Sequence, residues 1–117
     1  MARVRVTYPA LGRVDVVEKL REGCRGLEGK LPISRIILFG SYAQGRYTAG
    51  SDIDLIVVYK GREREDAYKT VVNEMGLPRL EPRLYTEEEF DALMKESPRF
   101  AEVLAKEGIV IIGAGER

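Results

Sequence analysis

The sequence predicts an α/β fold, more finely an α+β arrangement in which a small mixed β-sheet packs with helices. Apolar segments at 33–39, 52–59 and 109–112 have the composition of strands, and amphipathic segments alternate with them. Short connections coexist with connections long enough to hold a helix, so the sheet is expected to contain both parallel and antiparallel pairs. The 117 residues fit a single domain, residues 1–117, with one core.

Two helices are expected in the first two thirds of the chain. From Pro9 to about Glu28, apolar residues recur at helical spacing: Leu11, Val14, Val17, Leu20, Cys24 and Leu27. The second helix, Glu65 to Met75, carries Ala67, Tyr68, Val71, Val72 and Met75 on one side and ends at Gly76 and Pro78. Arg3 to Thr7 alternates polar and apolar residues, which fits either an edge strand or a loose terminus.

The last third of the chain begins with a strand at Leu80 to Tyr85, in which Pro82 indicates an edge position or a bulge. Thr86 and Glu89 match a capping box that starts a helix. Ser97 and Pro98 resemble an N-cap followed by proline, which opens a helix with Phe100, Val103 and Leu104 that Gly108 ends.

Composition excludes several classes of function. Basic and acidic residues number 19 each, which disfavours strong non-specific binding to nucleic acid. The absence of histidine excludes histidine catalysis and histidine-ligated zinc, and the single cysteine, Cys24, is expected to be small core filler. No signal peptide and no apolar run near the roughly 18 residues of a membrane span is present, so a soluble, cytoplasmic protein without membrane contact is expected.

Gly40 and Ser41 follow the first predicted strand directly and suggest a phosphate-binding corner. Glycine lets the backbone approach a ligand, and serine adds a hydroxyl beside a short helical turn at Tyr42 to Gln44. The segment is not a P-loop, because Arg46 and Tyr47 stand after Gly45 where lysine and a hydroxyl residue are needed. A tight turn without a ligand is the alternative interpretation of this glycine pattern.

Asp52 and Asp54 are the strongest candidates for metal ligands. They flank Ile53, so on a strand both carboxylates point to one face, with Cα atoms about 6.6 Å apart. Oxygen ligands suit Mg²⁺, and two such ions serve phosphoryl transfer in many enzymes. The alternative is that Asp52 caps a turn with Ser51 while Asp54 faces solvent.

Glu81 is the candidate for a third carboxylate, which would hold metal and accept the proton of an attacking hydroxyl. It lies on the polar face of the strand at 80–85, and Arg83 follows two residues later, where it can neutralise phosphate charge. A surface Glu–Arg pair on an edge strand is the other explanation of these two residues.

The segment from Gly40 to Leu55, GSYAQGRYTAGSDIDL, resembles the signature of the DNA polymerase β-type nucleotidyltransferase superfamily, and more narrowly that of the minimal nucleotidyltransferases. The resemblance implies that Gly40 and Ser41 hold a nucleoside triphosphate and that Asp52 and Asp54 bind two Mg²⁺ ions. Glu81 stands where many relatives have aspartate. Gln44 stands where many have arginine, a charge that Arg46 or Arg83 would replace.

The resemblance also implies an activity: transfer of a nucleoside monophosphate from ATP or another triphosphate to a hydroxyl acceptor. Minimal nucleotidyltransferases are commonly paired with HEPN-domain toxins, so the expected acceptor is a tyrosine of such a toxin and the expected role is that of an antitoxin. One alternative is a catalytically weak module that neutralises a toxin by binding it. Another is a transferase for a small molecule such as an aminoglycoside. The oligomeric state stays open.

Overall fold

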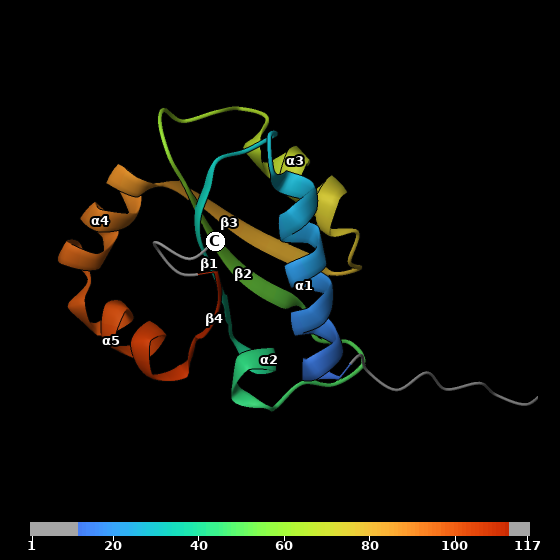
Figure 1. Ribbon diagram of the computed structural model, residues 1–117. Coiled ribbons are helices and arrows are strands. Elements are labelled where there is room, and N and C mark those ends of the chain that lie inside the picture. The colour runs from blue at the N-terminus through green and yellow to red at the C-terminus, as the bar shows by residue number, and fades with distance from the viewer. Residues whose placement is uncertain (1–11, 113–117) are drawn as a thin grey trace, which may run out of the picture.

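Helices cover both faces of one four-stranded sheet in the computed structural model, which describes residues 12–112 (Figure 1). The described elements, in chain order, are α1 (Arg13–Leu27), β1 (Ile33–Phe39), α2 (Ser41–Gln44), β2 (Ile53–Tyr59), α3 (Ala67–Met75), β3 (Leu80–Thr86), α4 (Glu87–Glu96), α5 (Pro98–Glu107) and β4 (Ile109–Ile112). The start of the first predicted helix, residues 9–11, and the segment 3–7 lie outside the described residues. None of the helices within the described range is long and apolar enough to cross a membrane.

The sheet is mixed, as predicted, with the strand order β3-β2-β1-β4. β1 pairs antiparallel with β2 and with β4, whereas β2 pairs parallel with β3. The parallel pair requires a crossover connection, and α3 lies in that connection. β3 is an edge strand, which explains how the sheet accommodates Pro82.

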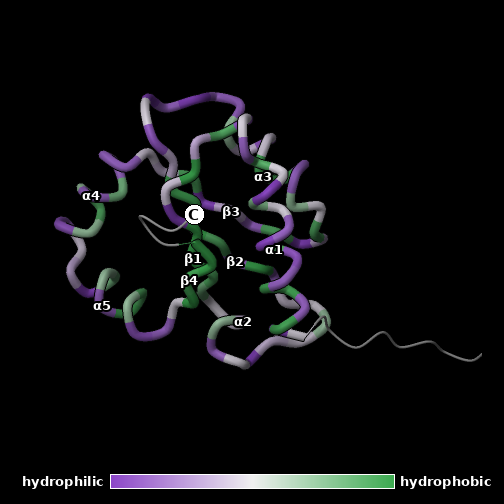
Figure 2. The backbone as a smooth tube through the Cα atoms, in the orientation of Figure 1, coloured by the Kyte–Doolittle hydropathy of each residue, from purple (hydrophilic) through white to green (hydrophobic). Residues whose placement is uncertain are grey.

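Two apolar layers hold the sheet between its helices. On one face, α1 and α3 pack on alternate residues of the central strands, including Leu38, Leu55 and Val57. On the other face, Phe90 of α4 and Leu104 of α5 pack on Ile37, Ile56 and Val58. Figure 2 shows hydrophobic residues along β1, β2 and β4, whereas the surrounding helices contain both hydrophilic and hydrophobic residues. The central strands are therefore buried on both sides, which is why they read as continuous apolar runs.

Helix α1 buries Leu20, Cys24 and Leu27 as predicted, and it differs from the prediction at its start. Val14 was expected in the core, yet it is 71% exposed, and Val16 is fully buried instead. At 3.6 residues per turn, Val14 lies about 120° around the helix from Leu20, outside the face that contacts the sheet. Cys24 is core filler, as predicted, and burial raises the pKa of its thiol to about 11.

Two further apolar predictions were wrong, since Tyr68 of α3 is 52% exposed and Val103 of α5 is 42% exposed.

The N-terminal caps of α4 and α5 differ from one another. At the start of α4 both bonds of the capping box form, with Glu89 N donating to Thr86 Oγ1 at 3.1 Å and Thr86 N donating to Glu89 Oε1 at 2.9 Å. Ser97 occupies the N-cap position of α5 without a side-chain capping bond, so Pro98 at N1 is the part of that signal that is confirmed.

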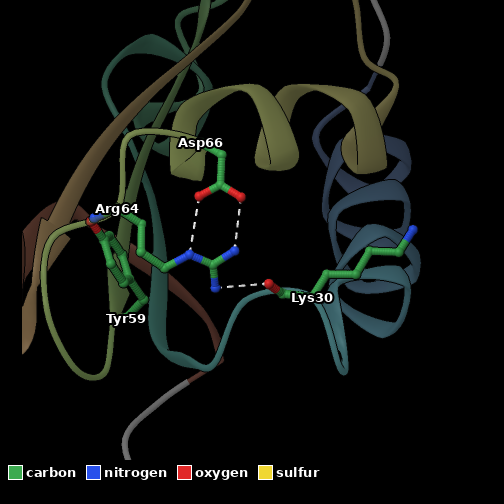
Figure 3. A network of polar contacts seen from close by, with 4 residues as sticks. All are labelled: Lys30, Tyr59, Arg64 and Asp66. Atoms are coloured by element: carbon green, nitrogen blue, oxygen red, sulfur yellow. Dashed lines mark hydrogen bonds and ion pairs between the residues drawn. The ribbon is translucent and has the colours of Figure 1, made fainter.

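A polar network fixes the connection that follows β2 (Figure 3). The Arg64 guanidinium donates two hydrogen bonds to Asp66, at 3.0 and 2.9 Å, and a third to the carbonyl of Lys30 at 2.9 Å. The backbone N–H of Arg64 donates to the hydroxyl of Tyr59 at 3.0 Å. These bonds tie the C-terminal end of β2 to the loop after α1, at the end of the strand opposite to Asp52.

Substitution in α1 tests which face of that helix is buried. Leu20→Ala is expected to lower the free energy of unfolding by about 2–5 kcal/mol, because it leaves a cavity under the sheet. Val14→Ala is the matched control and is expected to change it by no more than about 0.5 kcal/mol. Urea denaturation followed by circular dichroism measures both, and a Val14→Ala cost equal to that of Leu20→Ala would contradict the orientation of α1.

Candidate functional site

The register of the sheet brings Asp54 and Glu81 side by side. Asp54 is the direct partner of Glu81 in the parallel β2–β3 pair and of Phe39 in the antiparallel β1–β2 pair. Residues paired in this way point to the same face of a sheet, here the face covered by α4 and α5. Two of the three predicted carboxylates therefore lie on neighbouring strands near the N-terminal end of β2.

Gly40 packs directly against Asp54. Its backbone has φ +78° and ψ −153°, a conformation that residues with a side chain rarely adopt. A Cβ atom at this position would overlap an Asp54 carboxylate oxygen and lie 3.2 Å from Cγ and 3.3 Å from Cβ of the same residue. The glycine thus allows the chain to turn from β1 into α2 while the carboxylate occupies the space beside it.

Asp52 precedes β2, and 53% of its side chain is exposed. Arg79 Nε lies 3.6 Å from Asp52 Oδ1, and the carbonyl of Arg79 accepts a bond from Ile53 N at 2.8 Å. The preceding turn is closed by Ser51, whose hydroxyl accepts a bond from Thr48 N at 2.8 Å. The turn bonds that the structure contains do not use the Asp52 carboxylate.

The environment of Asp54 disfavours its charged form. Its pKa is raised above the ordinary value, chiefly because the side chain is half-buried and next because the Asp52 carboxylate is near. Arg83 opposes the shift and Glu81 adds to it. A bound cation would relieve this repulsion.

Arg83 lies on the same face as the carboxylates. Its guanidinium stands over the ring of Phe39, 5.4 Å from the centroid, and Phe39 in turn meets Phe100 of α5 edge to face at 6.4 Å. Glu81 and Arg83 are both exposed, and no ion pair joins them. The two residues therefore lie on the surface of an edge strand, as the alternative interpretation expected, but they do not form an ion pair with each other.

The remaining predicted residues, Ser41 and Arg46, lie at opposite ends of helix α2. Ser41 is its first residue, directly after Gly40, while Gly45 ends it in the left-handed conformation. Arg46 follows, and its guanidinium donates to the side-chain oxygen of Gln44. The one-turn helix is as predicted, and it places Ser41 at one end and Arg46 beyond the other.

The residues present fit a hard cation such as Mg²⁺ in chemistry, because the available donors are carboxylate oxygens. The pKa of Asp54 is raised chiefly by burial and next by the nearby Asp52 carboxylate, so a cation would favour the charged form. Asp52 and Asp54 would be the first ligands, with Glu81 on the neighbouring strand. Between residues 12 and 112, however, no three side chains of His, Cys, Asp or Glu are grouped tightly enough to hold one ion together. The third ligand stays a prediction.

Two residues near the carboxylates were not predicted. Phe39 is the antiparallel partner of Asp54. Arg79, a loop residue with φ +60°, forms an ion pair with Asp52. Nothing in the local sequence marks Arg79, because its pairing depends on the loop before β3 reaching the start of β2.

Comparison with known proteins finds similarity in sequence over most of the chain. Residues 17–111 match the family model described as "Nucleotidyltransferase domain". Over 26 residues, the chain is 65% identical to a protein of Methanocaldococcus jannaschii whose name describes it as a protein adenylyltransferase. That match covers 22% of this chain and 26% of the relative, so it spans about a quarter of the relative's length.

Three solved structures share the fold. A structure described as a nucleotidyltransferase from Sulfolobus solfataricus has a TM-score of 0.56 at 20% identity, over 84% of this chain and 80% of its own. A toxin–antitoxin structure with AMP-PNP has a TM-score of 0.55 at 22% identity, over 85% and 74% of the two chains. A mutant of the toxin–antitoxin MntA–HpeT has a TM-score of 0.53 at 17% identity, over 90% and 76%.

Replacing Gly40 tests the packing between the glycine and Asp54. Gly40→Ala and Gly61→Ala both place alanine at a positive φ, which is expected to cost each variant about 1–3 kcal/mol of unfolding free energy. Only Gly40→Ala meets a neighbour, since a Cβ at Gly61 has nothing within 4 Å. Gly40→Ala is therefore expected to cost about 1–3 kcal/mol more than Gly61→Ala in chemical denaturation.

A double-mutant cycle locates the source of that difference. Asp54→Ala in the Gly40→Ala background is expected to recover part of the added cost, because it removes the carboxylate that the new methyl group meets. Equal costs at Gly40 and Gly61, or no coupling to Asp54, would show that the close approach does not constrain the site.

Proposed function

The chain belongs to the nucleotidyltransferase domain family, and we propose that it transfers AMP from ATP to a hydroxyl group of a protein. The observation that carries this proposal is the register pairing of Asp54 with Glu81 beside a glycine that packs on Asp54. Gly40 and Ser41, proposed to bind phosphate, are thus next to the proposed metal-binding carboxylates. Transfer of a nucleotidyl group needs both of these parts together.

Each predicted residue has a separate task in the proposed reaction. Backbone N–H groups after Gly40, with the Ser41 hydroxyl, hold the phosphates of the nucleotide. Glu81 accepts the proton of the acceptor hydroxyl at its carboxylate. The acceptor oxygen then forms a bond to the α-phosphorus, the bond between that phosphorus and the bridging oxygen to the β-phosphate breaks, and pyrophosphate leaves. Arg83, which lies near Asp54, offsets negative charge at the same face.

Asp52 and Asp54, together with Glu81, would hold Mg²⁺, with two ions expected. When bound, these ions supply Lewis-acid polarisation of the phosphoryl oxygens and neutralise charge on the attacking and leaving oxygens. The chain's own carboxylates fix where such ions sit. The exposed Asp52 lies directly before β2, and the half-buried Asp54 is the second residue of that strand.

A protein acceptor is supported by the relatives. The Methanocaldococcus jannaschii protein is described as a protein adenylyltransferase, and two structures of the same fold are toxin–antitoxin assemblies, one of them with the ATP analogue AMP-PNP. We therefore propose a paired toxin of the HEPN class as the acceptor, modified on a tyrosine hydroxyl, and an antitoxin role for this chain.

Label transfer tests the activity directly. The purified chain, incubated with Mg²⁺, α-labelled ATP and the paired toxin, is expected to label the toxin on tyrosine. Asp52→Asn/Asp54→Asn is expected to reduce the rate by more than about 100-fold, because several kcal/mol of transition-state stabilisation are lost. Glu81→Gln is expected to reduce it by about 100-fold or more, through loss of the proton acceptor.

Asp91→Asn is the matched control, since Asp91 is exposed on α4 and belongs to no part of the proposed site. Its rate is expected to equal that of the unaltered chain. Absence of labelled toxin, or labelling that the double aspartate variant leaves undiminished, would contradict the proposal. Labelling of a small hydroxylated acceptor with none of the toxin would favour a small-molecule transferase.

A binding module that neutralises a toxin by complex formation is the second candidate. It is favoured by one observation, that the described carboxylates do not converge into a three-ligand group. The two candidates differ in the behaviour of Asp52→Asn/Asp54→Asn. A binding module predicts that this variant still binds the toxin and still restores growth of cells that express it, whereas the transferase predicts that growth is not restored.

A further inference from the structure

Arg79 lies beside the candidate site in a backbone conformation that arginine seldom adopts. Its φ is +60°, and between residues 12 and 112 it is the one residue other than glycine with a positive φ. Pro78 and Arg79 form the turn that leads into β3. Proline followed by a residue of positive φ is the pattern of a type II turn, in which glycine or asparagine usually takes the second position. The chain therefore has arginine where the backbone favours glycine.

The core holds this turn from both sides. Leu77 before the turn and Leu80 after it are buried in the apolar layer under α1 and α3. The carbonyl of Arg79 accepts a hydrogen bond from Ile53 N at 2.8 Å, which ties the turn to the first residue of β2. The backbone of Arg79 is therefore fixed next to Asp52 by contacts that do not involve its side chain.

The side chain of Arg79 pairs with Asp52 and with no other acid in the described part of the chain. Arg79 Nε lies 3.6 Å from Asp52 Oδ1, and both side chains are more than half exposed. This distance is longer than a hydrogen bond, so the contact is electrostatic. Within residues 12–112, Asp52 is the one candidate metal ligand that has an ion-pair partner, since Asp54 and Glu81 have none.

Fold stability does not account for an arginine at this position. A residue with a side chain in the left-handed region destabilises the fold, and an exposed ion pair contributes less than that strain costs. Glycine would suit the turn better and would keep the bond from Ile53 to the carbonyl of residue 79. The use of the arginine therefore lies in the effect of its charge on Asp52.

We propose that Arg79 is a counter-ion that competes with divalent cations for Asp52 and so lowers the affinity of the site for a free cation. The inference rests on the proposed function in one respect, that Asp52 is a metal ligand. A cation that approaches Asp52 meets a positive charge beside it, and the guanidinium is free to move aside because no hydrogen bond joins it to the carboxylate. Arg79 acts through Asp52, so it is a positioning residue and not a catalytic one.

Titration of the purified chain with Mn²⁺, in the absence of nucleotide, tests the proposal by electron paramagnetic resonance of the free ion. Arg79→Gln keeps the strained backbone and removes the charge, and it is expected to tighten Mn²⁺ binding by about 2- to 10-fold. Arg79→Gly is expected to tighten binding equally and also to raise the urea midpoint of unfolding, because it relieves the backbone strain. Arg79→Lys keeps the charge and is expected to bind Mn²⁺ like the unaltered chain.

The control variant removes the same charge from a distant position. Arg62 is exposed in the connection after β2, at the end of the strand opposite to Asp52. Arg62→Gln is expected to bind Mn²⁺ like the unaltered chain. The effect of Arg79→Gln is also expected to be smaller in about 0.5 M KCl than in about 0.05 M KCl, because salt screens interactions between exposed charges.

Several results would overturn the proposal. These are unchanged or weaker Mn²⁺ binding in Arg79→Gln, equal tightening in Arg62→Gln, and no detectable Mn²⁺ binding in any variant. Tightening in Arg79→Gly without tightening in Arg79→Gln would assign the effect to backbone strain and overturn it as well. A purely structural role changes the urea midpoint alone, with the same Mn²⁺ affinity in all variants, which is a further contradiction.

A double-mutant cycle shows whether Arg79 acts through Asp52. In the Asp52→Asn background, Arg79→Gln is expected to have little effect on Mn²⁺ affinity, because no carboxylate remains for the arginine to pair with. The same tightening with and without Asp52 would indicate a general effect of charge and overturn the pairing.

The outcome for Arg79 is separable from the outcome for the transferase activity. Mn²⁺ binding that tightens in Arg79→Gln, in a chain that labels no toxin, supports the counter-ion and removes the proposed activity. Labelling of the toxin by a chain whose Mn²⁺ affinity is the same with and without Arg79 supports the activity and overturns the counter-ion.

Discussion

The structure depends on the register between β1 and β2. This antiparallel pairing puts Phe39 opposite Asp54, and the chain then turns at Gly40, whose missing side chain leaves room for the carboxylate. A slip of one residue would turn every side chain of β2 to the other face. The apolar residues that pack under α1 and α3 would then face α4 and α5, and Asp54 would point into the core. The apolar burial that fixes the register of β2 therefore also determines the face to which the Asp54 carboxylate points.

The two faces of the sheet differ in the extent of their apolar packing and in their nearness to the candidate site. The layer under α1 and α3 contains the larger set of buried side chains and supplies most of the packing. The layer under α4 and α5 is smaller, and the aromatic contact between Phe39 and Phe100 lies beside the carboxylates. Apolar contact here lowers the solvation of Asp54, which is the main cause of its raised pKa. Packing on this face thus sets the electrostatics of the candidate site.

Much of the fold could be predicted from the sequence because local signals were strong. Apolar runs bounded by glycine and polar residues gave β1, β2 and β4, and the Thr86 to Glu89 pattern formed a complete capping box. The burial of Val16 in place of Val14 was missed, because several apolar residues competed for one narrow helical face. Glu81 could be proposed from its strand, but its pairing with Asp54 depends on the crossover through α3. The position of Arg79 beside Asp52 depends on contact between distant segments, which no local pattern encodes.

The edge position of β3 affects how large an acceptor can be. β2 occupies one side of β3, while the other side carries no strand within residues 12–112. Glu81 is exposed there, so a bulky molecule can approach it from the free flank of the sheet as well as from above. On a central strand the same carboxylate would be reached only through a narrow approach between neighbouring chains. The structure therefore leaves room for a macromolecular surface beside Glu81 at this edge of the sheet.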